Sequence, residues 1–289
     1  MDRKSARELQ EHMLGTYDTL RIMLTVIGIA LPIVVVAAAS FQEGRLWIES
    51  SISQYYHLAA RHPFFTARDL FVGGMLAAAV CLYSYKGFST RENVALNCAG
   101  VFAFFVAVLP IAIDEQDRGL RSVLHATAAV LFFLSIAYVS LRRSRDTLRL
   151  LPESKRARYA RLYFLTGLAM IASPAGAVVL SYALDAGSPT SRWIFFVETL
   201  GIWAFAAYWW FKTLEMRETK VDRRALDAEL ERELVAPLPS ADAGSTAANT
   251  VDKVLRRAMV PNTPTVERIV PANPPAAADS ADAASREAR

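Results

Sequence analysis

The sequence has few of the residues from which disulfide frameworks and metal sites are built. Its two cysteines, Cys81 and Cys98, both lie within apolar runs, so neither a disulfide framework nor a cysteine-based metal site is predicted. Four histidines are present. None of them forms a His-x-x-x-His or His-Glu-x-x-His pair of the kind that binds zinc. We therefore predict no metal site, and the residues identify no cofactor.

The chain also lacks a strong net charge and any motif that reads nucleic-acid bases. Its 32 Lys and Arg residues exceed its 28 Asp and Glu residues by four. The basic residues lie beside apolar runs, which indicates a role in membrane topology. We accordingly expect the lipid bilayer as a partner and no nucleic acid.

The feature present in excess is apolar length. Hydrophobic residues make up 53% of the 289-residue chain, more than the usual share in soluble domains, and they are clustered. A hydrocarbon core of about 30 Å requires roughly 20 helical residues. Six runs approach this length, so we predict an all-α protein, a six-transmembrane-helix bundle, with spans at about 21–41, 64–85, 94–113, 121–141, 162–184 and 193–212.

Polar segments flank this predicted transmembrane domain of residues 19–213. Residues 1–18 are predicted to form an N-terminal segment, residues 214–235 a charged helix, and residues 236–289, rich in Pro, Ala, Ser and Asp, a disordered tail. The first span could instead be a signal peptide, because Ala37-Ala38-Ala39 resembles a cleavage site. Its apolar run is longer than a signal core of about 7–15 residues, so we favour an uncleaved helix.

The distribution of basic residues predicts the orientation. Six spans place both termini on one side of the membrane. The N-terminal segment, the loop with Lys86 and Arg91, and the stretch from Arg142 to Arg161 are the basic connections. The positive-inside rule therefore predicts a cell (inner) membrane protein with both termini in the cytoplasm.

Polar and ionisable side chains gather on the predicted outer side. Glu198 would lie about 9 Å inside the span that begins near Arg192, at 1.5 Å per residue. A carboxylate at that depth must be neutral, paired or in a wet cavity, and Arg68 and His125 are the partners we expect. A structural ion pair that joins the sixth span to the second would explain Glu198 as well as a functional role would. The candidate ligand-binding residues are Ser53, Tyr55, His57, Arg68, Asp69, Asn97, Asp114, His125 and Glu198.

Three functions compete for this set. We favour binding or sensing of a lipidic or small polar ligand at an outer-facing pocket in the bundle. The first alternative is a proton- or ion-coupled transporter, in which Ser173-Pro174 would mark a broken helix. The second is a membrane-embedded metal-dependent hydrolase, with His57, His125 and a carboxylate as ligands. Ser53 and His57, four residues apart, could also form a nucleophile and its base.

Three motifs resemble those of a family of uncharacterised multi-pass bacterial membrane proteins. They are S-x-S-x-Y-Y from Ser51, R-D-x-F-V-G from Arg68 and Y-K-G from Tyr85, within a resemblance that extends to Lys212. The resemblance implies a six-span bundle and no established activity. It places seven of the candidates on motif positions: Ser53, Tyr55, Arg68, Asp69, Asn97, His125 and Glu198.

The order of Ser53, His57 and Asp69 is also similar in outline to the CREST group of membrane hydrolases. That resemblance implies a zinc-dependent hydrolase. The late paired histidines of the CREST group are absent from this sequence.

Overall fold

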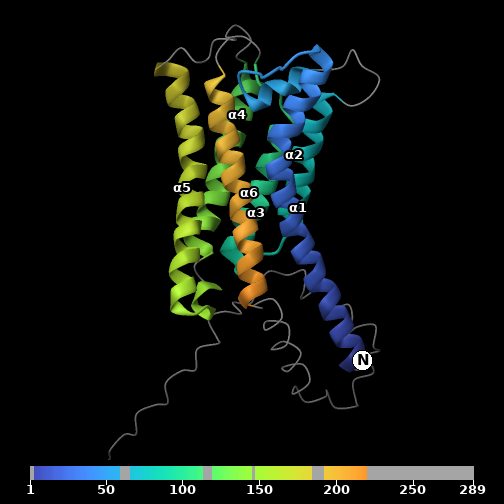
Figure 1. Cartoon of the computed structure of the whole chain (residues 1–289), viewed down its shortest axis with the longest axis vertical. Helices are drawn as coiled ribbons and strands as arrows, with labels where there is room; N and C mark the ends of the chain where they lie inside the picture. The colour runs from blue at the N-terminus through green and yellow to red at the C-terminus, as the bar shows by residue number, and fades with distance from the viewer. Residues whose placement is uncertain (1–2, 59–65, 113–118, 145–146, 184–191, 220–289) are drawn as a thin grey trace, which may run out of the picture.

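The computed structural model describes residues 3–58, 66–112, 119–144, 147–183 and 192–219, and these residues are predominantly helical (Figure 1). The six long helices are α1 (Arg3–Glu43), α2 (Ala67–Ser84), α3 (Thr90–Val108), α4 (Leu120–Tyr138), α5 (Glu153–Ala183) and α6 (Trp193–Thr219). Between them lie two 3-10 helices, η1 (Ile52–His57) and η4 (Thr147–Leu150), and the π-helix η3 (Val139–Arg143). No strand occurs in the described ranges. The predicted all-α class is confirmed.

The described residues contain six helices that are long and apolar enough to cross a bilayer. Large apolar side chains point away from the bundle along these helices; examples are Ile33 on α1, Val80 on α2, Phe104 on α3 and Leu200 on α6. An apolar surface of this extent is unusual for a soluble monomer and is the surface that lipid chains cover. The protein is a multi-pass membrane protein.

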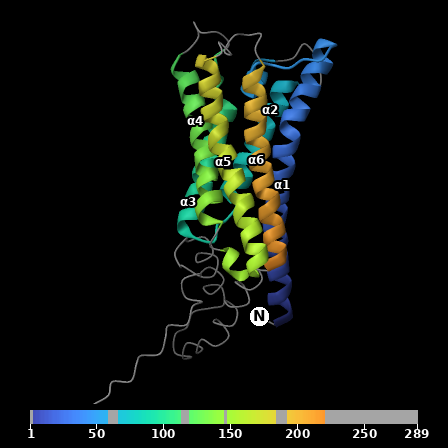
Figure 2. The same cartoon turned by 60° about the vertical axis from the view of Figure 1, so that its left-hand side comes forward.

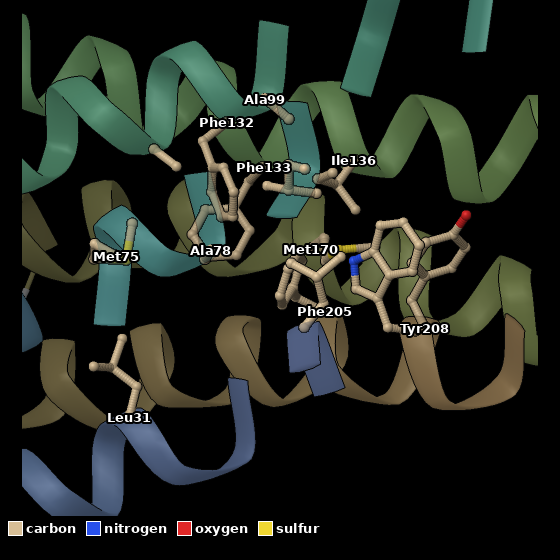
Figure 3. Close-up of a cluster of buried hydrophobic side chains, with 14 of the residues drawn as sticks. Leu31, Met75, Ala78, Ala99, Phe132, Phe133, Ile136, Met170, Phe205 and Tyr208 are labelled. Carbon is tan, nitrogen blue, oxygen red and sulfur yellow. The ribbon is translucent and has the colours of Figure 1, made fainter. Parts of the chain in front are cut away.

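The helices form a closed ring in which neighbours in sequence are neighbours in space. Each helix packs against the next, and α1 packs against α6 (Figures 1 and 2). Apolar side chains fill the interior, among them Met75, Phe132, Ile136 and Phe205 (Figure 3). In a bilayer, helix association depends on close packing, because lipid is as apolar as the core.

One glycine shows how closely two of these helices approach. A Cβ atom on Gly100 of α3 would lie 2.8 Å from the backbone oxygen of Ala79 on α2. A side chain at this position would therefore force the two backbones apart.

Several helix bounds differ from those predicted. One continuous α1 includes most of the N-terminal segment that we assigned to residues 1–18. The third helix ends at Val108 rather than near residue 113, because Pro110 disfavours a helical conformation in the residue before it. The sixth continues past Lys212 to Thr219 and so includes the first residues of the predicted charged helix. Residues 220–235 of that helix, and the predicted disordered tail, lie outside the described residues.

The two ends of the bundle differ in what they carry. The end with the C-terminus of α1, η1 and the start of α2 is named the η1 end here (top of Figure 1). The other, the terminal end, holds the N-terminus of α1, the connection from α2 to α3, and η3 and η4. At the η1 end, α2 begins with a capping box in which Thr66 and Asp69 bond each other's backbone N–H.

Candidate functional site

The helix η1 brings several of the predicted site residues to one end of the bundle. It carries Ser53, Tyr55 and His57, and Ile52, Ser53 and Tyr55 are buried. The Ser51 hydroxyl accepts the N–H of Ser53 and caps the helix. A helix this short is stabilised mainly by its tertiary contacts, so the residues that hold it define the site.

Glu198 of α6 anchors the start of η1. Its Oε2 atom accepts hydrogen bonds from the Ser51 hydroxyl at 2.8 Å and the Ile52 N–H at 2.7 Å, and Oε1 accepts from the same hydroxyl at 3.0 Å. We expected Arg68 or His125 as partner, and that expectation is wrong. A hydroxyl and a backbone N–H satisfy the carboxylate, and no sequence spacing indicates such partners.

His125 of α4 holds the middle of η1. Its Nε2 atom lies 2.9 Å from the Ser53 hydroxyl, and its Nδ1 atom lies 2.6 Å from the carbonyl oxygen of Leu109. A carbonyl can only accept, so the neutral ring carries its proton on Nδ1 and accepts the Ser53 O–H at Nε2. This is the geometry of a nucleophile with an oriented base. Both side chains are buried.

His57 does not pair with Ser53, contrary to the predicted four-residue pairing. Its Nε2 atom lies 2.6 Å from the carbonyl oxygen of Ile111. Gln54 donates to the neighbouring carbonyl of Ala112 at 2.9 Å. These bonds tie η1 to the segment after α3, where the backbone is not helical and its carbonyls need donors.

The Tyr55 side chain of η1 is fully buried. Its hydroxyl accepts the Glu49 N–H at 3.3 Å and donates to the Trp47 carbonyl at 3.4 Å. Its ring meets Phe195 of α6 edge-on, with centroids 6.2 Å apart. Burial raises the pKa of the Tyr55 phenol to about 12, so this side chain is neutral at physiological pH and supports the fold of the site.

Arg68 and Asp69 lie on the first turn of α2. Arg68 donates to the Tyr56 hydroxyl at 3.2 Å, and its guanidinium carbon lies 4.5 Å from the Tyr56 ring centroid, a cation–π contact. Asp69 accepts the Thr66 N–H at 3.1 Å and the Thr66 hydroxyl at 2.9 Å through Oδ2.

A groove of about 620 Å³ opens beside these two residues. Its rim is polar and consists of Tyr56, Thr66, Arg68 and Asp69. Its walls continue along α2 and the end of α3 and are apolar, formed by Val72, Gly73, Leu76, Ala107 and Val108. We expected a pocket between the second, third, fourth and sixth spans, whereas this groove lies between α2 and α3 under η1.

The candidate residues therefore occupy different places. His125 and Glu198 hold η1, the former through Ser53, and Arg68 and Asp69 line the groove. Asn97 lies near the middle of α3, and its buried Oδ1 has no hydrogen-bond partner among the described residues. Asp114 lies outside the described residues. In the described ranges, no group of three or more His, Cys, Asp or Glu side chains could hold a metal ion.

Sequence reasoning missed a second polar cluster, at the terminal end. Lys212 and Glu215 of α6 are 1% and 0% exposed and form an ion pair with Nζ and Oε2 3.0 Å apart. Thr147 of η4 and Tyr163 of α5 each donate a 2.5 Å hydrogen bond to the carboxylate. The Lys212 ammonium also donates to Thr147 at 3.0 Å. The i,i+3 spacing of a Lys and a Glu was the signal available, and we read Lys212 as the end of the span.

The π-helix η3 and the residue that follows it add two buried serines, Ser140 and Ser144, to this cluster. The N–H of Ser144 bonds the Val139 carbonyl five residues earlier at 2.9 Å, the pattern of a π-turn. Ser144 contacts the Tyr208 hydroxyl at 3.1 Å, and Ser140 donates to the Tyr163 carbonyl at 2.8 Å. The cluster thus joins the ends of α4, α5 and α6.

Comparison with known proteins gives one match. The sequence model of the family described as "Protein of unknown function (DUF998)" matches residues 25–211. The match runs from α1 to α6 and covers more than half of the chain. No curated protein and no solved structure matches.

Proposed function

The chain belongs to the DUF998 family of proteins of unknown function, and we propose that it binds an amphipathic ligand, a membrane lipid, in the groove between α2 and α3. The proposal is based on the geometry of the η1 end. The headgroup lies at the rim beside Arg68, and an acyl chain lies along the apolar walls. The observation that carries this proposal is the division of one groove into a polar rim and apolar walls.

The size of the groove suits such a ligand. Its volume of about 620 Å³ lies within the range of about 300–1,000 Å³ found for ligand pockets. From Thr66 to Leu76 the groove follows α2 for ten residues, which is about 15 Å at 1.5 Å per residue. That length is about half of a 30 Å hydrocarbon core, the depth of one leaflet.

Small side chains keep the groove open. Gly73 has no atom within 4 Å of the position a Cβ would take, and Ala107 forms part of the opposite wall. A larger side chain at residue 73 would occupy the space that we assign to the acyl chain.

Charge supports an orientation in which the groove faces the outer leaflet. At the η1 end the described residues include four Arg and no Lys: Arg45, Arg68, Arg121 and Arg192. The connections of the terminal end are richer in Lys and Arg, most of all between Arg142 and Arg161. By the positive-inside rule, the terminal end and both chain termini lie in the cytoplasm and the protein resides in the cell (inner) membrane.

The proposal is tested by filling the groove. Gly73→Trp places a large ring between α2 and α3, whereas Val80→Trp places the same ring on an outward position of α2 that is 65% exposed. Native mass spectrometry of detergent-purified protein measures the lipid that stays bound. We expect the Gly73→Trp variant to lose bound lipid and the Val80→Trp variant to retain it. Equal retention in both variants would refute the groove as the site.

A second candidate function, acyl-ester hydrolysis, is favoured by the pair of Ser53 and His125. The Ser53 oxygen would attack the acyl carbon while His125 Nε2 takes its proton and passes it to the departing alcohol; water would then release the acyl group. Ser53 precedes Tyr56 of the groove rim by one turn of η1. Labelling of wild type but not of Ser53→Ala by a fluorophosphonate probe would support hydrolysis, and no labelling of either would reject it.

A further inference from the structure

The rim of the groove carries charges of both signs on consecutive residues. Arg68 and Asp69 both line it. We propose that the bound lipid has a zwitterionic headgroup with a phosphate and a primary ammonium, as in an ethanolamine phospholipid. This inference rests on the proposed function and specifies its ligand.

Arg68 is placed to receive the phosphate. A guanidinium has five N–H donors in a planar fork that fits phosphate oxygens. Among the described residues the hydrogen-bond acceptor of Arg68 is the Tyr56 hydroxyl, at 3.2 Å, and the cation–π contact with the same ring fixes the guanidinium in place. Donors of Arg68 therefore remain for a ligand.

Asp69 is placed to receive the ammonium. Its Oδ2 atom is committed to the Thr66 N–H and hydroxyl, whereas Oδ1 has no hydrogen-bond partner in the described part of the chain. The side chain is exposed. The Thr66 hydroxyl donates to Asp69 Oδ2 and accepts the Asp69 N–H, so Thr66 is occupied by the cap. The free carboxylate oxygen can accept an N–H donor from a ligand.

This arrangement distinguishes headgroups by their chemistry. A headgroup with phosphate alone would leave Asp69 beside a second negative charge, which is unfavourable. A choline headgroup carries a quaternary nitrogen without an N–H and cannot donate to Oδ1. A primary ammonium has three donors and can bond Asp69 while the phosphate bonds Arg68. The apolar walls select a lipid rather than a free headgroup.

The experiment is a competition between three lipids with identical acyl chains. Purified protein is mixed with equimolar ethanolamine, choline and glycerol phospholipids, and native mass spectrometry measures the bound ratio. We expect the ethanolamine lipid to be enriched about two- to fivefold, the range of one solvent-accessible ion pair. Asp69→Asn, which keeps the shape of the cap, should abolish the enrichment, and Asp69→Glu, which keeps the charge, should restore it.

Arg68→Gln should reduce binding of all three phospholipids, because each contains a phosphate. Arg121→Gln removes an arginine at the same end that does not line the groove and should change nothing. Preference for the glycerol lipid, or an unchanged ratio in Asp69→Asn, would overturn the inference while leaving lipid binding intact. If the wild-type protein binds no more lipid than Gly73→Trp does, the proposed function itself is refuted.

Discussion

Replacing Lys212 with Met should destabilise the protein far more than replacing a surface lysine whose ion pair has the same length. Lys212 and Glu215 are buried, with Nζ and Oε2 3.0 Å apart. Removing the ammonium leaves an uncompensated carboxylate inside the bundle, which costs about 3–5 kcal/mol. In a domain of 150–250 residues, each kcal/mol lost lowers Tm by about 2–4 °C, so Tm should fall by roughly 6–20 °C.

The chain contains a matched control for this change. Lys155 and Glu218 also join charges 3.0 Å apart, but their side chains are 55% and 37% exposed. A surface pair contributes about 0–1 kcal/mol, so Lys155→Met should lower Tm by at most a few degrees. The charges are equally far apart in the two pairs, so the difference in Tm reports burial together with the hydrogen bonds that Thr147 and Tyr163 add to the buried pair.

The single variant Glu215→Gln and the double variant Lys212→Met/Glu215→Gln complete a double-mutant cycle with wild type and Lys212→Met. The double variant removes both charges, and the glutamine oxygen can still accept one of the two hydrogen bonds that Thr147 and Tyr163 donate to separate carboxylate oxygens of Glu215. A buried pair replaced as a whole often costs little, so the double variant should be closer to wild type than either single variant. Thermal unfolding in detergent, followed by tryptophan fluorescence, measures all four proteins. A double-variant loss equal to the sum of the single losses would refute the coupling.

Three further predictions concern the η1 end and the helix contacts. Glu198→Ala leaves the Ser51 hydroxyl and the Ile52 N–H without their acceptor, which costs about 1–3 kcal/mol and should speed hydrogen exchange at residues 51–57. Glu198→Gln retains an acceptor and should have a smaller effect. Equal exchange rates in the two variants would contradict the role of Glu198 as the anchor of η1. The Tyr55 pKa is raised to about 12 by burial, so its contribution to stability is complete below pH 10 and is lost as pH rises through 12; Tyr55→Phe should flatten the fall in Tm over this window, and an unchanged slope would refute the assignment. Gly100→Val places a Cβ atom 2.8 Å from the Ala79 carbonyl oxygen and should lower stability by about 1–3 kcal/mol. Light scattering during heating measures the change. Stability equal to that of wild type would show that α2 and α3 can separate without cost.

The fold could be predicted from sequence because the bilayer imposes length and apolarity on each span. The six runs therefore identified the six helices. Helix ends were less predictable, since they depend on local chemistry: Pro110 ends α3 early, and the Thr66–Asp69 cap starts α2 at Ala67. We assigned Glu215 to the charged helix after the sixth span, whereas Thr147 of η4 and Tyr163 of α5 bond its carboxylate inside the bundle.

Individual site residues could be named from sequence, but their partners could not. Ionisable groups within apolar runs stand out, which is why His125 and Glu198 were selected. Their partners are two serine hydroxyls, a backbone N–H and a backbone carbonyl of segments distant in sequence. Such groups occur throughout any chain, so only the folded arrangement shows which of them meet. The position of the groove could not be predicted either, because small residues such as Gly73 and Ala107, which keep it open, carry no chemical signal in the sequence.

Photo-crosslinking from the groove wall tests the central claim of lipid binding most directly. A benzophenone amino acid is placed at Val108, which lines the groove, or at Phe104, an exposed position on the same helix outside it. The purified proteins receive one equivalent of a clickable phospholipid in detergent. The account predicts strong labelling from position 108 and weak labelling from position 104, with the former abolished by Gly73→Trp. Equal labelling from both positions, insensitive to Gly73→Trp, would contradict it.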